Sequence, residues 1–284
     1  MREGIPSGTS FAVALARGLG VDERAIDPYA SRWLPGFMGR LAAAPRRLGV
    51  AGKLVRQAVR AGSFGMVDHM VLRTEVIDAK LTGAIEAGVS QVVILGAGLD
   101  ARAWRMPILE SIPVFEVDHP STQSFKRARV RGHQPPTEIR YVPVDFQREQ
   151  FSTRLLETGF DTDRPTAWIW EGVAMYLPED AVRDSVAQMT ALSPRGSHLL
   201  MTYRTPDRLP FGRLGKVVIP MAFAAGGEPL GVVFTPSELA QVLAPHWQVS
   251  YDADAFGWRA FTPSSADPAL SFLSERFADA ERSL

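Results

Sequence analysis

Residues 92–100 read VVILGAGLD, and this stretch decides how the chain is interpreted. A run of apolar residues leads directly into Gly96, Ala97 and Gly98. Glycine lets the backbone turn sharply, and a side chain at either glycine would keep a ligand away from the backbone N–H groups. The stretch therefore predicts a buried strand that ends in a ligand-binding turn, although the tripeptide by itself also fits a tight turn without a ligand.

Short apolar runs alternate with amphipathic segments after residue 90. The apolar runs predict strands at 91–95, 113–117, 139–144, 167–170 and 198–202, and the segments between them predict helices at 121–131, 147–158 and 178–192. Continuous apolar runs are typical of parallel strands that are buried on both faces. The alternation therefore predicts an α/β fold with a right-handed, doubly wound parallel sheet.

The region before residue 90 has a helical texture. Apolar residues recur at helical spacing in 11–19, 37–41, 48–59 and 71–85, and the segments are broken by Pro28, Pro35 and Pro45. We therefore expect two units, an N-terminal helical cap over residues 1–88 and the sheet-containing domain over residues 89–284.

The C-terminal part departs from the strand–helix rhythm. Residues 205–232 are rich in Pro and Gly and include Met221 and Phe223, which predicts an inserted lid over the substrate. Thr235 begins a capping box for a helix that runs through Val242. Two runs, 248–251 and 257–261, are expected to close the sheet as an antiparallel pair, and the polar tail from residue 264 is expected to end in a surface helix.

Composition excludes several classes of protein. The chain has 284 residues, no Cys, five His without an HExxH spacing, and 31 basic against 31 acidic residues. These counts argue against a disulfide framework, a metal site, and a nucleic-acid or membrane partner recruited by overall charge, although local patches stay open. The most apolar stretch, 217–225, is too short to span a bilayer, so a cytoplasmic protein is expected.

One local patch is basic. Residues 28–67 contain seven Lys and Arg side chains and no acidic residue. Such a run usually forms a solvated helix face, and the alternative is an entrance for an anionic substrate or carrier.

The residues around the glycine turn indicate which ligand it binds. A dinucleotide fingerprint would place a third glycine at Ala101, and Asp100 would bring a negative charge next to phosphate. The Gly/Ala form of the fingerprint tolerates Ala101, but the Asp100 charge disfavours NAD and FAD. A cationic cofactor without phosphate, such as S-adenosyl-L-methionine, tolerates Asp100.

Acidic residues follow three of the predicted strands, where a doubly wound sheet binds its ligands. Asp118, in competition with Glu116, is placed to accept ribose hydroxyls, or alternatively to cap the helix that begins at Pro120. Asp145 and Phe146 are placed to receive adenine. Glu171 follows an aromatic run and would be costly to bury without a cation or a hydrogen-bond donor.

These segments together resemble the leucine carboxyl methyltransferase family, especially its bacterial S-adenosylmethionine-dependent branch. The likeness covers roughly residues 8–204 and rests on GAGLDARAWR at 96–105, FEVD at 115–118, VPVDF at 142–146 and WEGVAMYL at 170–177, with RAIDPYA at 24–30 and RT at 73–74 upstream. Ala101 stands where the bacterial pattern usually has Thr, and Trp104 where Tyr is common. The likeness gives nothing on the substrate, because no match extends past Thr205.

The resemblance implies a class I methyltransferase with a Rossmann-like sheet. It also implies functional roles for individual residues that the sequence around them does not decide. It implies that Arg73 pairs with the carboxylate of the cofactor's methionine moiety, and that Glu171 lies near its amino group. It further implies that the glycine turn lines the methionine and ribose path, with Asp118 at the ribose and Asp145 and Phe146 at the adenine. Without the resemblance, Arg73 would be interpreted as an arginine on a helix surface.

The expected reaction is O-methylation of a carboxyl, phenolic or other hydroxyl oxygen in a small molecule, for example a polyketide-like metabolite. A carboxylate is already ionised and needs no base, whereas a hydroxyl needs one. His119 is the best-placed histidine, although a capping role suits it as well. Tyr203 and Arg204, expected just beyond the fifth strand, are candidates for substrate contacts.

Three alternatives stay open at this point. The first is a methyltransferase of protein C-termini, and the second is a protein that binds the cofactor without methylating. A nucleotide-dependent dehydrogenase is a more distant third. A monomer or a homodimer is compatible with the sequence.

Overall fold

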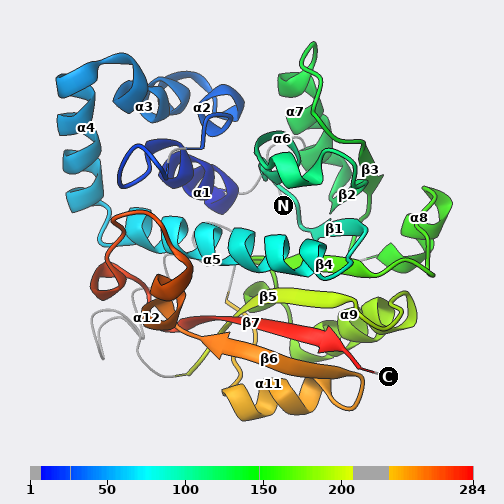
Figure 1. Ribbon diagram of the computed structural model, residues 1–284. Coiled ribbons are helices and arrows are strands. Elements are labelled where there is room, and N and C mark those ends of the chain that lie inside the picture. The colour runs from blue at the N-terminus through cyan, green and yellow to red at the C-terminus, as the bar shows by residue number, and fades with distance from the viewer. Residues whose placement is uncertain (1–7, 26, 147, 207–229, 284) are drawn as a thin grey trace.

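The stretch at 92–100 lies at the centre of a sheet in the computed structural model, which describes residues 8–25, 27–146, 148–206 and 230–283. Within these residues, seven strands form one sheet in the order β3-β2-β1-β4-β5-β7-β6 (Figure 1). Their bounds are β1 (Gln91–Leu95), β2 (Val114–Asp118), β3 (Ile139–Pro143), β4 (Thr166–Trp170), β5 (His198–Arg204), β6 (Trp247–Ala253) and β7 (Glu275–Arg282).

The first five strands confirm the predicted parallel sheet. β1 pairs in parallel with β2 on one side, Val92 opposite Val114, and with β4 on the other, Val92 opposite Ala167. Every residue of β1, β2 and β4 is buried, as expected for strands covered on both faces. The carboxyl ends of β1, β2 and β4 therefore meet at one edge of the sheet.

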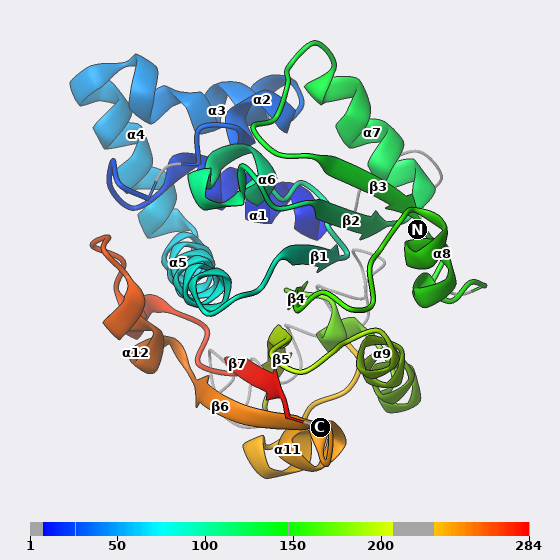
Figure 2. The same ribbon diagram turned by 45° about the vertical axis from the view of Figure 1, so that its right-hand side comes forward.

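The helices lie in two layers. The described helices are α1 (Gly8–Leu19), α2 (Ala30–Trp33), α3 (Gly36–Arg47), α4 (Gly49–Gly62), α5 (Met66–Glu86), α6 (Arg102–Arg105), α7 (Pro120–Val130), α8 (Phe151–Glu157), α9 (Glu179–Ala191), α11 (Pro236–Leu243) and α12 (Ala255–Trp258). Short 3₁₀ turns are η1 (Pro107–Leu109), η2 (Ala174–Tyr176), η3 (Arg259–Phe261) and η4 (Pro268–Leu270). Figure 2 shows α5 and α9 on opposite sides of the strands.

Alternating residues of the strands define the two cores. Val92, Ile94 and Ile169 pack with α1 and α5, whereas Val93 and Trp168 pack with α8, α9 and α11 on the opposite face. The helices α1 and α5 thus share one core with the sheet, although they belong to the part predicted as a separate cap.

Three predicted helices of the N-terminal part are longer than expected. The segments expected at 37–41, 48–59 and 71–85 become α3, α4 and α5. Pro45 was expected to lie in the break between the segments 37–41 and 48–59, but it lies within α3, which continues to Arg47. A Pro near the end of a helix still disrupts the ladder there, and α3 ends within two residues.

The C-terminal predictions are partly wrong. The helix capped by Thr235 is confirmed, with its capping box intact. The run 257–261 is helical, in α12 and η3, and the partner of β6 is instead β7, in the tail predicted as a surface helix. β7 lies between β5 and β6 and is antiparallel to both.

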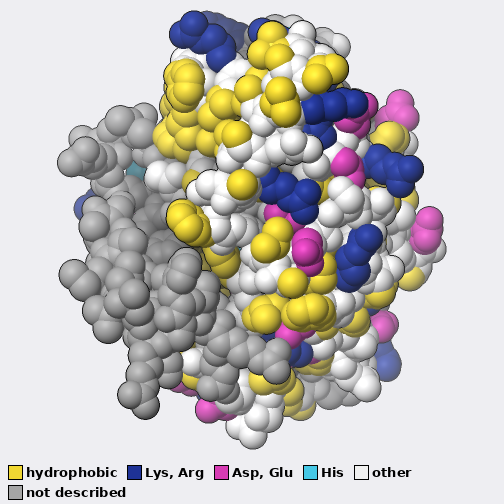
Figure 3. Space-filling view, turned by 90° about the vertical axis from the view of Figure 1, so that its left-hand side faces the viewer, with side chains coloured by type: hydrophobic (Ala, Val, Ile, Leu, Met, Phe, Trp, Pro, Cys, Tyr) yellow, Lys and Arg dark blue, Asp and Glu magenta, His cyan; other side chains and the backbone are white. Residues whose placement is uncertain are grey.

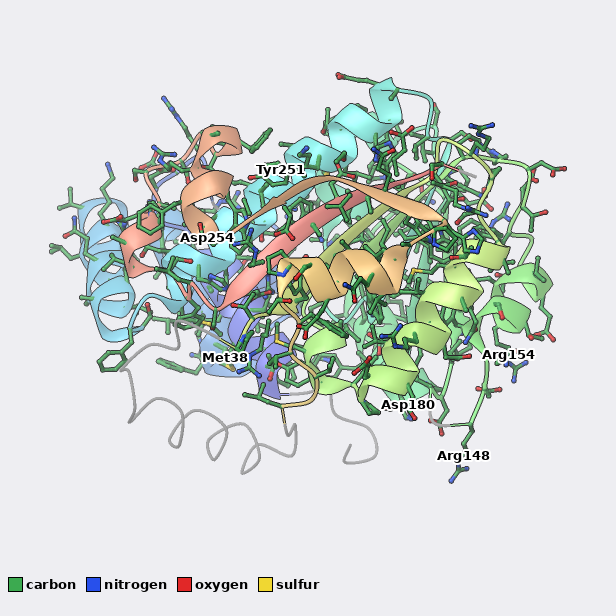
Figure 4. All side chains as sticks on the ribbon, turned by 90° about the horizontal axis from the view of Figure 1, so that it is seen from below. Met38, Arg148, Arg154, Asp180, Tyr251 and Asp254 are labelled. Atoms are coloured by element: carbon green, nitrogen blue, oxygen red, sulfur yellow. The ribbon has the colours of Figure 1, made fainter. Side chains whose placement is uncertain are left out.

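The reason for the error is visible in β7 itself. The strand is inserted inside the sheet, so Phe277, Ala278 and Ala280 are fully buried, while Asp279 between them pairs with His198 and Lys80. In the sequence, the charged residues of β7 hide the apolar positions that are buried in the structure. Figure 4 shows Tyr251 of β6 beside α5, where the Nζ of Lys80 lies 4.4 Å from its ring centroid.

Within the described ranges, no helix is long and apolar enough to cross a membrane. Most of the predicted lid, including Met221 and Phe223, lies outside the described residues. The chain returns beside the sheet, since Gly231 N–H donates to Met175 O at 2.7 Å and Phe234 N–H donates to Arg204 O at 2.9 Å.

Candidate cofactor site and its ion cluster

The glycine turn closes against the end of β2. Gly96 and Gly98 have φ values of +68° and +48°, which other residues rarely adopt. The N–H of Gly98 donates to Asp118 Oδ2 at 2.5 Å, and the N–H of His119 donates to Asp118 Oδ1 at 2.6 Å. The predicted turn and the predicted carboxylate are therefore in direct contact.

Asp118 and Glu116 lie on the same face of β2, but their surroundings differ. Glu116 is buried against Lys126, whose Nζ lies 2.6 Å from Glu116 Oε2. Burial raises the pKa of Glu116, with the Lys126 charge opposing it. Asp118 lies at the strand tip with only backbone donors on its oxygens, so the geometry favours Asp118 over Glu116 as the residue that accepts a ligand.

A second feature of the same sheet edge is a carboxylate surrounded by arginines. The Glu171 side chain, 7% exposed, contacts three guanidinium groups. Arg73 Nε lies 2.8 Å from its Oε1 and Arg102 Nη1 lies 2.8 Å from its Oε2, while Arg17 Nη2 also bonds Oε1. The sequence predicted that a buried Glu171 needs a cation or a hydrogen-bond donor. Three arginines, each from a different helix, meet this requirement.

The ionisation state of Glu171 follows from these charges. Burial alone would raise its pKa, but Arg17, Arg102 and Arg73 outweigh burial and hold the pKa well below the ordinary value. Glu171 is therefore a carboxylate at neutral pH.

Glu275, from β7, extends the cluster to the other side of Arg73. Arg73 Nη1 donates to Glu275 Oε1 at 3.0 Å, and His69 Nε2 lies 2.6 Å from Glu275 Oε2. His69 Nδ1 lies 2.6 Å from Ser271 Oγ, so both ring nitrogens have a partner. Burial raises the pKa of Glu275, but Arg73 and His69 lower it to about 2.

The Asp100 charge is also compensated. Arg102 Nη1 bonds Asp100 Oδ2, and the Arg102 N–H donates to Asp100 Oδ1 at 2.7 Å. Burial raises the pKa of Asp100, but the Arg102 and Arg17 charges outweigh it and lower the pKa. The sequence argument that Asp100 repels a phosphate is therefore weaker than we expected, because the carboxylate is neutralised locally.

We call this set of charges the ion cluster; its members are Arg17, Arg73, Asp100, Arg102, Glu171 and Glu275. The set holds three cations and three anions, and Arg102 Nε also lies 2.8 Å from Asp78 Oδ1. A buried cluster of this kind persists only when each charge keeps its partners.

The two residues predicted to bind adenine lie just past the end of β3, at the same edge of the sheet. Asp145 and Phe146 follow β3, and Phe146 is 43% exposed. Its ring centroid lies 6.4 Å from that of Phe151 in α8. An exposed aromatic ring beside a carboxylate suits a planar heterocycle, and the assignment stays a prediction.

The three residues predicted for the reaction are separated by the structure. His119 caps α7, accepting the Ser121 N–H on Nδ1 at 3.3 Å, so the capping alternative is confirmed. Tyr203 and Arg204 lie within β5 rather than beyond it. Because side chains alternate along a strand, they point to opposite faces.

Tyr203 packs into the core beside α9 and α11, and its hydroxyl donates to Asp252 Oδ2 at 2.6 Å. Burial, the first cause, raises its pKa, and the hydrogen bond to Asp252 adds to the effect. This hydroxyl is committed to β6 and does not reach the ion cluster. Arg204 instead lies on the cluster side, opposite Glu275 in the ladder.

Sequence reasoning missed Arg17, Arg102 and Glu275 as members of the site. Arg17 carried a signal, because it is a charge in the otherwise apolar stretch 11–19. Arg102 lies inside the GAGLDARAWR motif and was quoted without a role. Glu275 had no signal, since its segment was interpreted as a surface helix.

The described residues contain no group of His, Asp and Glu that could hold a metal ion. They do fit an adenosyl cofactor at the glycine turn. A Cβ at Gly96 would lie 2.5 Å from Val173 Cγ2, and one at Gly98 would lie 3.2 Å from Ser10 Oγ, so bare backbone is required there. The Asp118 carboxylate has about four acceptor positions and uses two, which leaves room for ribose hydroxyls.

Comparison with known proteins agrees with this geometry. Residues 11–190 match the leucine carboxyl methyltransferase family. The chain is 34% identical over 246 residues to a Mycobacterium ulcerans protein provisionally named S-adenosyl-L-methionine-dependent methyltransferase, covering 80% of this chain and 71% of that protein. A Mycobacterium tuberculosis protein with the same provisional name is 41% identical over 143 residues, covering 50% of this chain and 45% of its own. The chain therefore belongs to the leucine carboxyl methyltransferase family.

Solved structures support the fold. A DUF574 family protein from Streptomyces avermitilis superposes with a TM-score of 0.65 at 17% identity, covering 98% of both chains. A Thermobifida fusca protein superposes with a TM-score of 0.61 at 18% identity, covering 99% of this chain and 96% of that one. The expected Rossmann-like fold of class I methyltransferases is confirmed.

Proposed function

We propose that this protein transfers a methyl group from S-adenosylmethionine to a carboxyl or phenolic or other hydroxyl oxygen of a small molecule. Methyltransferase activity and the cofactor follow from the family. The oxygen acceptor and its small size are proposed from the position of Arg204.

Each residue of the sheet edge has a role toward the cofactor. Asp118 accepts the ribose hydroxyls, Phe146 stacks on the adenine and Asp145 accepts its exocyclic amine. Arg73 binds the carboxylate of the methionine part and Glu171 receives its ammonium group. The cofactor supplies an electrophilic methyl group on a sulfonium; the chain's task is to align an acceptor with it.

The acceptor side is marked by Arg204. This side chain is half-buried at the end of β5, and no hydrogen bond or ion pair of its guanidinium occurs among the described residues. Its cross-strand neighbour Glu275 is already bound by Arg73 and His69. Burial lowers the pKa of Arg204, with Glu275 and Tyr176 opposing. An anionic acceptor would pair with this guanidinium.

The same observation favours a carboxylate over a neutral hydroxyl. A carboxylate arrives ionised and needs only orientation, which a guanidinium supplies in a bidentate manner. A hydroxyl would need a base, and His119 already uses Nδ1 in the cap of α7. A phenol with a separate acidic group stays compatible with Arg204.

The test is a methylation assay over small aromatic and aliphatic acids and phenols, with S-adenosylhomocysteine detected by mass spectrometry. Methyl esters are hydrolysed by mild alkali and aryl ethers are not, so the product identifies the oxygen. For an acidic acceptor, Arg204→Gln is expected to raise KM about ten- to hundredfold. Arg195→Gln, on an exposed turn, serves as the matched control. No S-adenosylhomocysteine with any acceptor would refute the proposal.

The second candidate is methylation of a protein C-terminus, which the name of the matched family favours. A methyl ester is the product of this candidate, and also of the first candidate when the small molecule is an acid. Peptides that end in leucine, assayed beside the small acids, distinguish them: methylation of the peptides alone would replace a small-molecule acceptor with a protein.

A further inference from the structure

Helix α4 exposes apolar side chains to solvent, unlike an ordinary surface helix. Its inner face buries Gly52 and Arg56, whereas Val50 is 77% and Leu54 is 62% exposed. Surface helices normally bury their apolar stripe and expose their charges. The alanines at positions 51, 58 and 61 are also exposed, so the outward side of α4 is mostly apolar.

The apolar surface continues past both ends of the helix. Leu48, just before α4, is 55% exposed, and Phe64, just after it, is 74% exposed. We call Leu48, Val50, Leu54 and Phe64 the α4 face. The helix rises about 20 Å between these ends. Figure 3 shows hydrophobic side chains gathered on the upper part of the view from this side, with Lys and Arg at their rim.

The charges around the α4 face are mainly basic, and Asp22 and Glu23 are acidic residues that lie beside Lys53. Arg46 and Arg47 are exposed in the last turn of α3, and neither forms an ion pair within the described residues. Lys53 projects from the outward side and pairs with Glu23 at 3.4 Å, and both side chains of this pair are more than half exposed. Exposed pairs of this kind are weak. The face therefore combines bulky apolar side chains with cations.

We propose that the α4 face binds the surface of an anionic lipid bilayer. Apolar side chains that enter the headgroup region and cations that meet anionic lipids are the two features of helices that lie in a membrane interface. The position of α4 at the outer edge of the molecule leaves this side free to approach a flat surface (Figure 1).

A second copy of the chain fits the same face less well. In a symmetric pair the same patch meets itself, which would bring Arg46, Arg47 and Lys53 toward their own copies. An anionic bilayer attracts these charges instead. The proposal is independent of the methyl acceptor.

The test is co-sedimentation of the full chain with vesicles of phosphatidylcholine alone or of equal parts phosphatidylcholine and phosphatidylglycerol. We expect binding to the anionic vesicles at least about tenfold tighter than to the neutral ones, and weaker binding at high salt. The variant Val50→Ser/Leu54→Ser should lose binding to both. The variant Arg46→Gln/Arg47→Gln should lose the preference for anionic vesicles.

Matched controls remove the same chemistry elsewhere. Leu156→Ser/Leu270→Ser deletes two leucines that are each 49% exposed, and Arg131→Gln/Arg195→Gln deletes two exposed cations. Both controls should bind vesicles like the unmodified chain. All variants should bind S-adenosylmethionine normally, because none of the changed residues belongs to the cofactor site.

Three results would overturn the proposal. The first is no sedimentation with either vesicle type, and the second is binding that the controls reduce as much as the α4 variants do. The third is a dimer of the unmodified chain that Val50→Ser/Leu54→Ser dissociates, without vesicle binding, which would assign the α4 face to self-association.

Discussion

Arg73 Nε lies 2.8 Å from Glu171 Oε1, and this ion pair joins helix α5 to the end of β4. The same guanidinium reaches Glu275 on β7 at 3.0 Å. Arg73 is 4% exposed, so both contacts are protected from solvent. The residue that the family resemblance assigns to the cofactor is therefore held in place by carboxylates from two strands before any ligand is considered.

Replacing Arg73 tests both of these roles. Arg73→Met should weaken S-adenosylmethionine binding about five- to hundredfold, through loss of a charge-assisted hydrogen bond. It should also destabilise the fold by about 3–5 kcal/mol, because two buried carboxylates lose a partner. Calorimetry and urea unfolding measure the two effects. Arg40→Met, at an exposed position of α3, should change neither.

The close packing around the glycine turn predicts that a side chain there disrupts cofactor binding. Gly96→Ala should abolish detectable cofactor binding, since its Cβ would lie 2.5 Å from Val173 Cγ2 at the turn itself. Gly132→Ala is the matched control, with φ of +82° and no atom within 4 Å of the added Cβ. Both variants bear the strain of a left-handed backbone, about 1 kcal/mol. Equal cofactor affinity in the two variants would contradict the prediction that a side chain at Gly96, pressed against Val173, disrupts the cofactor site.

The low pKa of Glu275 predicts how stability depends on pH. Its folded pKa is about 2 against an ordinary 4.5, so its contribution is complete above pH 4.5 and is lost as the pH falls toward 2. The difference corresponds to about 3 kcal/mol. In Glu275→Gln the fall in unfolding free energy over that interval should be smaller by a similar amount. Urea unfolding, taken down to the lowest pH at which it is reversible, gives both curves; parallel curves would contradict the assignment.

The position of β7 inside the sheet can be tested by truncating its core residue. Phe277 is fully buried, and Phe277→Ala should cost about 3–5 kcal/mol. Phe256, in α12, is 54% exposed, so Phe256→Ala should change stability by less than about 0.5 kcal/mol. If thermal unfolding showed equally small effects, the tail would be a surface segment as its sequence suggested.

The strands were predictable from the sequence where every residue of the strand is buried. The strands around Val92 and Ala167 are buried on both faces, so their apolar runs mark them clearly. β7 was missed because its burial depends on partners from distant segments: Glu275 meets Arg73, and Asp279 meets His198 at 2.9 Å. Charged residues in such a strand look solvent-exposed until those partners are known.

The site was predictable to the extent that it depends on the ends of strands. Gly98 and Asp118 are 20 positions apart in the sequence, and the topology of β1 and β2 brings them together. The ion cluster also depends on side chains from α1 and β7, and no spacing rule predicts that Arg17 meets Glu171 or that Glu275 meets Arg73. Tyr203 and Arg204 were paired as neighbours, yet strand alternation separates them.

The most direct test of the account is a calorimetric titration of the purified protein with S-adenosylmethionine, S-adenosylhomocysteine and NADH, repeated with Asp118→Ala. We expect micromolar binding of the first two and none of NADH. The variant should bind about five- to hundredfold more weakly. Binding of NADH, or equal affinity in a folded Asp118→Ala variant, would contradict the cofactor site described for this sheet edge.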